Sequence, residues 1–214
     1  MPYFEDRIDA GRELAAALRD VEFVDPVVLA LPRGGVPVGV VVAEALGAPL
    51  DVFVSRKVGA PGHPEFGIGA IAEDGSGVVD AESVSALGLS RRRYGALVAA
   101  ERRELERRVH RYREGRPGAE VHGRDVVLVD DGLATGVTAD AALRALWRRE
   151  PRRIVLAVPV GSPDTTARLR GRGEEVVCVA EPDDFRAVGY WYRHFDQVSD
   201  DEVCELLRRA TPSE

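Results

Sequence analysis

The chain has 214 residues, of which 45% are hydrophobic and 30% are charged, and its formal net charge is −7. This length and composition are typical of one globular domain and exclude a disordered or fibrous protein. No apolar run reaches the roughly 20 residues that cross a bilayer, and the first residues lack the basic start of a signal peptide, so we expect a cytoplasmic protein that contacts no membrane. The acidic charge argues against DNA as a partner.

Two rare residue types are informative. Cys178 and Cys204 lack the spacing of metal ligands or of a redox pair, so we expect reduced, mostly buried thiols. Lys57 is the only lysine among 29 basic residues. It either sits where a compact ammonium group on a flexible stem is needed, or has merely escaped replacement by arginine.

Short β-branched runs alternate with helical patterns along the chain. The runs predict five buried strands, at 26–31, 50–55, 125–130, 153–158 and 175–180. Helices are predicted at 36–46, 138–149 and 163–171, where proline and glycine mark their ends. The pattern predicts an α/β fold, a parallel five-stranded sheet flanked by helices. We expect a single domain over residues 1–214, with its core at about 24–192.

A Gly/Pro-rich stretch at 57–67 follows the second predicted strand. Such segments permit motion, so we expect a flexible loop that serves as a small flap over a site. Residues 66–72 are predicted to form the antiparallel strand of this flap. Glu73, which follows it, either orients the loop or faces water, and the second interpretation is favoured.

Residues 90–113 predict a long helix that is capped by Ser90 and inserted into the α/β pattern. Ten arginines and four glutamates fall between residues 90 and 116. The favoured interpretation is a solvated face with i,i+4 ion pairs, or a contact between the subunits of a homodimer. The alternative is a binding surface for a polyanion.

The segment 126–138 carries most of the chemistry. Four apolar residues deliver Asp130 and Asp131 to the carboxyl end of a strand, where open α/β sheets bind ligands. The loop that follows offers backbone N–H groups and two hydroxyls at a helix N-terminus, which suits a phosphate dianion. Carboxylates accept hydrogen bonds from vicinal hydroxyls, so the segment fits a ribose 5-phosphate. A P-loop signature is absent, and a dehalogenase site would place its acids two residues apart.

Residues 126–138 resemble the signature of type I phosphoribosyltransferases that binds 5-phosphoribosyl 1-diphosphate (PRPP). The resemblance implies a Mg²⁺-dependent enzyme that moves the phosphoribosyl group from PRPP to a small nitrogenous base and releases diphosphate. Asp130 and Asp131 are then catalytic and contact the metal, mostly through water or ribose hydroxyls. The 5-phosphate is bound by the loop Ala134, Thr135, Gly136, Val137 and Thr138. At the fourth of these positions the family usually has glycine, so this loop is stiffer.

Two further segments extend the resemblance. Arg33, Gly34 and Gly35 resemble the diphosphate-binding loop, because the glycines permit close backbone approach and the guanidinium offers a fork of donors. Arg56 and Lys57 resemble the cationic pair before the mobile loop of the adenine and orotate enzymes. The resemblance implies that both are catalytic and neutralise the leaving diphosphate, and that Lys57 binds it while loop closure excludes water.

Residues 181–192 resemble the hood segment of the hypoxanthine-guanine enzymes. The resemblance implies a hood formed by the terminal segments, with a C-terminal hood and helix at about 181–210. The resemblance implies that Phe185 stacks on the base, although these aromatic residues would also serve as core at the sheet edge. Ala134 stands where those enzymes have aspartate, so the identity of the base does not transfer.

Two other functions stay open. The first is a PRPP- or nucleotide-sensing regulator that performs no transfer and that could bind RNA through the helix at 90–113. The second is a diphosphate transfer to ribose 5-phosphate, for which no ATP site is evident in the sequence.

Overall fold

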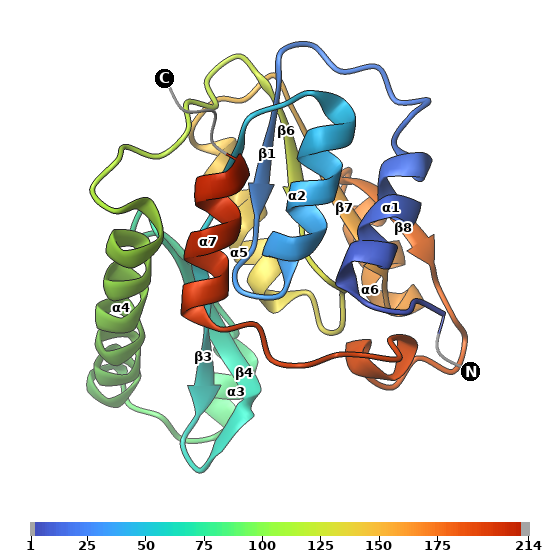
Figure 1. The fold of residues 1–214 in the computed structure, drawn as a ribbon. Helices are drawn as coiled ribbons and strands as arrows, with labels where there is room; N and C mark the ends of the chain where they lie inside the picture. The colour runs from blue at the N-terminus through green and yellow to red at the C-terminus, as the bar shows by residue number, and fades with distance from the viewer. Residues whose placement is uncertain (1–2, 211–214) are drawn as a thin grey trace.

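Two β-sheets organise the chain in the computed structural model, which describes residues 3–210 (Figure 1). The larger sheet is parallel and has the strand order β2-β1-β6-β7-β8. Its strands are β1 (Pro26–Ala30), β2 (Leu50–Val52), β6 (Asp125–Val129), β7 (Arg153–Val160) and β8 (Glu175–Ala180). The predicted parallel five-stranded sheet is therefore confirmed, with strand ends that differ by a few residues.

Helices cover both faces of this sheet. One face carries α1 (Arg7–Ala17) and α2 (Gly35–Leu46), and the other carries α5 (Val137–Trp147) and α6 (Pro163–Gly171). Because successive strand residues point to opposite faces, Val127 of β6 packs with α1 and α2 while Val126 and Leu128 pack with α5 and α6. The helix α7 (Asp200–Ala210) lies between α2 and α4 (Figure 1). None of the helices in residues 3–210 combines the length and the apolar content that crossing a membrane requires.

The end of the second strand and the expected flexible loop differ from the prediction. β2 ends at Val52, and the chain enters a separate antiparallel sheet of β3 (Ser55–Ala60), β4 (His63–Ala72) and β5 (Gly77–Val79). The stretch 57–67 is a β-hairpin rather than an irregular loop: Val58 is buried as strand residues are, and Gly62, at φ +79°, supplies the turn. Arg56 and Lys57 thus lie inside a hairpin strand of the flap.

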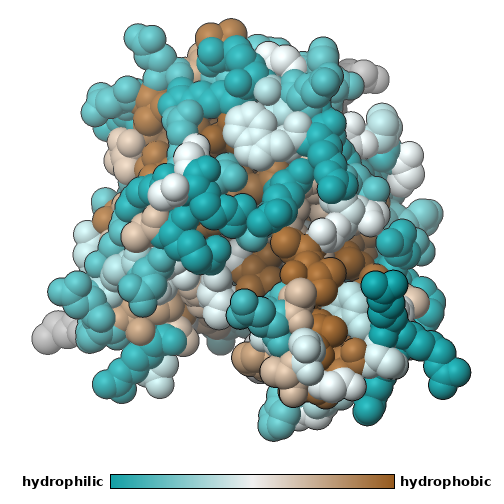
Figure 2. Space-filling view, turned by 180° about the vertical axis from the view of Figure 1, so that it is seen from behind, coloured by the Kyte–Doolittle hydropathy of each residue, from teal (hydrophilic) through white to brown (hydrophobic). Residues whose placement is uncertain are grey.

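The long helix α4 (Arg91–Arg113) packs across this second sheet, with α3 (Ala81–Ala86) preceding it. Its cap is the predicted one, since the Ser90 hydroxyl accepts a hydrogen bond from the Arg93 N–H at 3.3 Å. The apolar stripe, which includes buried Leu105 and Tyr112, faces the flap and α7. Seen from behind, apolar surface gathers over the flap, where Phe66 is exposed (Figure 2). A homodimer through α4 stays a prediction, and it would have to use the polar face of this helix.

Two smaller predictions can be compared with the structure. Both cysteines are free thiols, with Cys204 buried and Cys178 half-buried. Glu73 does not face water, because its side chain is 4% exposed. It accepts hydrogen bonds from Arg113 at 2.9 Å, from Arg149 at 3.1 Å and from the Val54 N–H at 3.0 Å. These arginines lie 40 and 76 residues further along the chain, a proximity that no local pattern could indicate.

Arg113 ties the end of α4 to the junction between the two sheets. Its guanidinium also lies 3.1 Å from Asp51 of β2, so one buried cation serves two carboxylates. Burial alone would lower the pKa of Arg113, but the facing charges of Glu73 and Asp51 outweigh burial and raise it. The network fixes the flap relative to the larger sheet.

We expect Arg113→Ala to lower the free energy of unfolding by about 3–5 kcal/mol, because it leaves Glu73 and Asp51 without their shared counter-ion. Urea unfolding followed by circular dichroism measures the change. The control is Arg103→Ala, an exposed arginine of the same helix, which should change stability by less than about 0.5 kcal/mol. Equal losses in the two variants would contradict the assignment.

Candidate active site at the carboxyl edge of the parallel sheet

The centre of the parallel sheet is a topological switch point. β1 and β6 are neighbours, yet β1 leads into α2 on one face and β6 leads into α5 on the other. The two loops therefore diverge at the carboxyl ends of adjacent strands and leave a crevice there, which is where open α/β sheets bind ligands. The first loop carries Arg33, Gly34 and Gly35, and the second carries Asp130 and Asp131.

These two loops touch, and only glycine permits the contact. A Cβ atom at Gly34 would lie 1.9 Å from Oδ2 of Asp131, and one at Gly35 would lie 2.7 Å from the carbonyl oxygen of Val129. Any side chain at either position would displace the acidic pair or the strand beneath it. The peptide bond between Pro32 and Arg33 in the same loop is cis. The structure thus brings together two motifs that are about a hundred residues apart in sequence.

Residues from near the two ends of the sequence, which together form the hood, hold the acidic pair in place. Nε of Arg7 donates to Oδ2 of Asp131 at 2.9 Å, and the Tyr192 hydroxyl donates to the backbone oxygen of Asp131 at 2.5 Å. Oδ1 of Asp130 accepts the Asp131 N–H at 2.9 Å. Burial, reinforced by the charge of Asp131, raises the pKa of Asp130 well above its ordinary value. Burial also raises the pKa of Asp131, although Arg7 opposes that shift.

Sequence reasoning missed Arg7. It lies 124 residues from Asp131, at the start of a helix, α1, for which the sequence analysis made no prediction. Its guanidinium stacks 3.9 Å from the ring centroid of Phe195 and donates to the backbone oxygen of Asp196 at 2.8 Å. The start of α1 and the segment at 195–196 thus meet beside the acidic pair.

The predicted phosphate loop has the expected form at the N-terminus of α5. Gly136 caps this helix at φ +72°, where a Cβ atom would lie 2.7 Å from the methyl group of Thr165. The loop is hydrogen-bonded to α6. The Thr165 hydroxyl donates to the Ala134 oxygen at 2.6 Å, and Arg168 donates to the Thr135 oxygen at 2.9 Å. Both bonds are accepted by carbonyl groups of the loop. The backbone N–H groups in the first turn of α5 have no intrahelical partners, and they point outward from the end of the helix.

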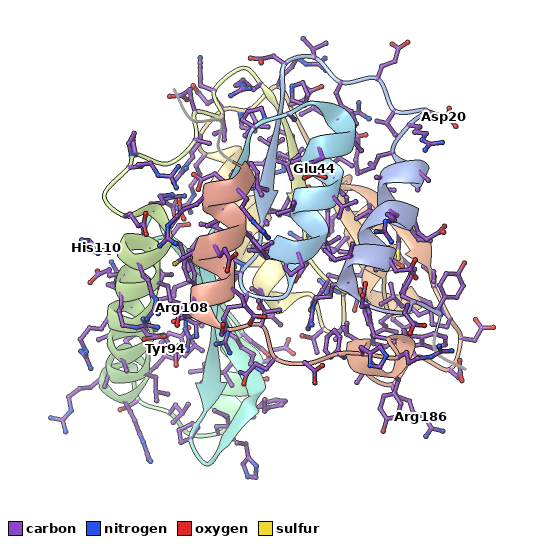
Figure 3. The ribbon with its side chains drawn as sticks, in the orientation of Figure 1. Asp20, Glu44, Tyr94, Arg108, His110 and Arg186 are labelled. Atoms are coloured by element: carbon purple, nitrogen blue, oxygen red, sulfur yellow. The ribbon has the colours of Figure 1, made fainter. Side chains whose placement is uncertain are left out.

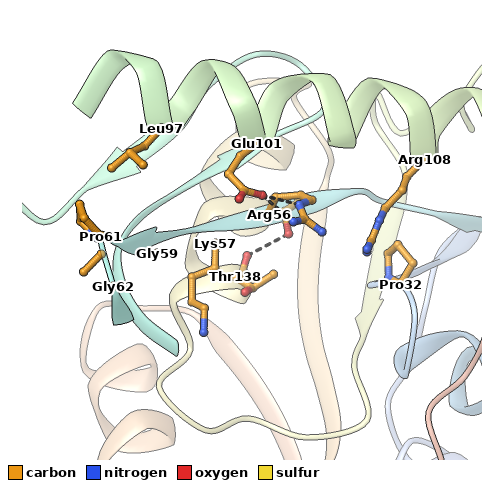
Figure 4. Close-up of a pocket in the computed structure, with 12 residues that line it drawn as sticks. Pro32, Arg56, Lys57, Gly59, Pro61, Gly62, Leu97, Glu101, Arg108 and Thr138 are labelled. Carbon is orange, nitrogen blue, oxygen red and sulfur yellow. Dashed lines mark hydrogen bonds and ion pairs between the residues drawn. The ribbon is translucent and has the colours of Figure 1, made fainter. Parts of the chain in front are cut away.

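A cleft of about 570 Å³ opens beside this loop (Figure 4). Its walls are β3, α4, the phosphate loop at Thr138 and the loop after β1 at Pro32. The Ser55 hydroxyl donates to the Thr138 oxygen at 3.2 Å and so fastens the flap to the phosphate loop. Three cationic side chains line the cleft, namely Arg56, Lys57 and Arg108.

The predicted cation pair is split by strand geometry. Alternate residues of β3 point to opposite sides, so Arg56 turns toward α4 and pairs with Glu101 at 2.6 Å (Figure 4). Lys57 extends the other way, toward Thr138. Its aliphatic stem packs against Gly67 of β4, where a Cβ atom would lie 3.0 Å from the stem. Lys57 is therefore the member of the pair that faces the phosphate loop.

The hood combines segments from both ends of the chain, as predicted. Phe4 and Tyr192 stack at 5.4 Å between ring centroids, and Val188 of the short helix η1 (Val188–Trp191) packs on Gly132, just after the acidic pair. Phe185 is half-buried in this cluster. It therefore contributes to the packing of the hood, and its stacking on a base stays a prediction.

Comparison with known proteins identifies the family. A profile of the phosphoribosyl transferase domain matches residues 4–191. The chain belongs to this family. Two curated relatives, from two strains of Mycobacterium tuberculosis and provisionally named phosphoribosyl transferases, are 48% identical over 210 residues. The match covers 98% of this chain and 47% of each relative, so the chain spans about half their length.

Solved structures share the phosphoribosyltransferase fold. The protein TT1426 from Thermus thermophilus is 46% identical, covers 99% of this chain and 100% of its own, and superposes with a TM-score of 0.83. A protein from Neisseria gonorrhoeae, solved with bound ppGpp, is 13% identical, with a TM-score of 0.54 over 99% of this chain and 98% of its own. At that identity the likeness shows the fold alone.

We expect Asp130→Asn to stabilise the protein at neutral pH. The raised pKa means that the folded state holds this proton more tightly than the unfolded state does, so stability falls as pH rises from 3.8 through the folded-state pKa. Asparagine removes that loss and still accepts the Asp131 N–H. Thermal unfolding over a pH series should show a difference that grows with pH. The control is Asp20→Asn at an exposed position remote from the site (Figure 3), and a gain that matches it would contradict the assignment.

We expect Gly34→Ala to weaken PRPP binding and to cost about 1–3 kcal/mol of stability, because the methyl group collides with Asp131. Calorimetry and thermal unfolding measure the two effects. The control is Gly95→Ala in α4, where a Cβ atom meets nothing within 4 Å and should stabilise the helix by about 0.5–1 kcal/mol. Normal stability and PRPP affinity in Gly34→Ala would show that the contact is not essential.

Proposed function

We propose that this chain transfers the 5-phosphoribosyl group of PRPP to a nitrogenous base and releases diphosphate. The observation that supports this most is the contact of Gly34 with Asp131 beside a phosphate loop at the N-terminus of α5. The contact sets an anion-binding loop, two acceptors for ribose hydroxyls and a cradle for a phosphate dianion around one crevice. PRPP carries the complementary groups in the same order.

The residues have distinct roles in this proposal. The loop 134–138 binds the 5-phosphate, and Asp130 accepts hydrogen bonds from the ribose hydroxyls. Arg33 and Lys57 hold the diphosphate. The bond between C1 and the diphosphate oxygen breaks, and its electron pair leaves with the diphosphate. A ring nitrogen of the base then donates a pair to C1 and passes its proton to solvent water. The protein contributes position and charge stabilisation.

The acidic pair is compatible with Mg²⁺. Mg²⁺ prefers oxygen ligands and is usually held by one or two carboxylates together with substrate phosphates. Within residues 3–210 no group of three histidine, cysteine or acidic side chains is placed to hold a metal by itself. The metal would thus be shared between Asp130, Asp131 and the substrate, where it supplies neutralisation of the diphosphate oxygens.

The test is release of diphosphate from PRPP with Mg²⁺ and a panel of adenine, hypoxanthine, guanine, xanthine, uracil and orotate. We expect release with one base, and we expect Lys57→Ala to lower kcat by about 100-fold because the leaving group loses its ammonium partner. The control is Arg148→Ala, which removes a charge just after the far end of α5 and should leave kcat unchanged. Release in Lys57→Ala at the wild-type rate would remove Lys57 from the mechanism.

A nucleotide-sensing function is the second candidate. The observation that favours it is the excess of arginine around the cleft, which suits a ligand with several phosphates. The Neisseria gonorrhoeae protein of the same fold binds ppGpp, a nucleotide of this kind. Tight PRPP or ppGpp binding without release from any base would support this candidate. RNA binding is less favoured, because Arg107 and Arg108 pair with Glu104 within the chain.

A further inference from the structure

The arginine-rich helix reaches the proposed diphosphate site. Arg108 lies in the last third of α4, and its side chain is 18% exposed. It projects from the helix on the side that faces β3 and α7, whereas His110 points away (Figure 3). In the close-up, the Arg108 guanidinium lies beside Pro32, at the base of the loop that carries Arg33 and Gly34 (Figure 4).

A set of hydrogen bonds brings this part of α4 close to Arg33. Asp200, at the start of α7, accepts from the Tyr112 hydroxyl at 2.7 Å and from Arg107 at 2.9 Å, and it lies 3.8 Å from Nη1 of Arg33. Burial opposes ionisation of Asp200, but these hydrogen bonds and the nearby charges of Arg107 and Arg108 lower its pKa. Arg33 and Arg108 thus approach the same crevice from two different elements.

The charges in this region do not balance locally. Nε of Arg108 donates to Glu104 at 2.8 Å, but Glu104 also binds Arg107 at 2.7 Å. Among the described residues that line the cleft, Arg56 and Arg108 are accompanied by one carboxylate, that of Glu101, and Arg56 pairs with it. A site with this excess attracts a polyanion, and a guanidinium held at Nε can still direct its Nη groups to phosphate oxygens.

We propose that Arg108 is an additional binding residue for the diphosphate of PRPP, supplied by α4, and that Glu104 positions it. The inference rests on the proposed function. It makes α4 a third wall of the site, opposite the loop after β1 and beside β3. It also gives part of the arginine-rich surface a role that neither i,i+4 pairing nor a subunit contact requires.

The test is calorimetric binding of inorganic diphosphate, in the presence of Mg²⁺, to the full chain. We expect Arg108→Ala to raise Kd by tenfold or more, since a charge-assisted bidentate contact is lost, and Arg108→Lys to raise it by less because a point charge remains. The control is Arg103→Ala, an exposed arginine on the same helix that removes the same charge, and its Kd should stay within twofold of wild type. Thermal unfolding verifies that each variant is folded.

Ribose 5-phosphate is the second probe. Its affinity should not change in Arg108→Ala, because it contacts the loop 134–138 and carries no diphosphate. An unchanged diphosphate Kd in Arg108→Ala, or an equal loss for both probes, overturns the role of Arg108 while the proposed function stands. A wild-type protein that binds neither diphosphate nor PRPP overturns the proposed function together with this inference. If Arg108→Ala fails to fold, Arg108→Lys decides by the same comparison of probes.

Discussion

The close approach of the loop after β1 to the acidic pair after β6 is the constraint on which the site depends. Gly34 lies so near Asp131 that even a methyl group would occupy the position of the carboxylate. This approach requires the two strands to be neighbours and their helices to leave on opposite faces, which the strand order provides. It also removes water from the carboxyl groups, and this desolvation raises the pKa of Asp130. The strand order, the absence of a side chain at Gly34 and the raised pKa of Asp130 are therefore all linked to this one contact.

The distribution of charge follows from the same arrangement. The chain is acidic overall, yet cationic side chains gather where loops, flap and α4 enclose the cleft. Several arginines in the C-terminal half of α4 are matched by carboxylates, such as Glu104 for Arg107 and Arg108, and Asp201 for Arg111. Such exposed pairs add little stability. The helix contributes more through Tyr112 and Leu105, which are buried between the flap and α7.

The parallel sheet and the glycine turn that begins α5 could be predicted from the sequence, because both depend on local patterns. A doubly buried strand is apolar throughout, and Gly136 needs only its own left-handed φ to start α5. The flap was misjudged where that local signal is ambiguous. Phe53 and Val54 continue the apolar run of β2, although the strand itself ends at Val52. Contacts such as Glu73 with Arg149 depend on tertiary structure and have no local signature.

Arg7 explains why two adjacent carboxylates are useful at this position. Asp131 is engaged on one side by Arg7 and Tyr192 of the hood, and on the other by the backbone of Gly34. It therefore connects the segment expected to cover a base with the loop expected to hold the diphosphate. Oδ1 of Asp130 accepts a hydrogen bond from the neighbouring backbone N–H, and a carboxylate has further lone pairs that can accept one from a sugar hydroxyl. The two acids thus divide the work: Oδ2 of Asp131 is engaged by Arg7 of the hood, while Asp130 faces the position expected for the sugar.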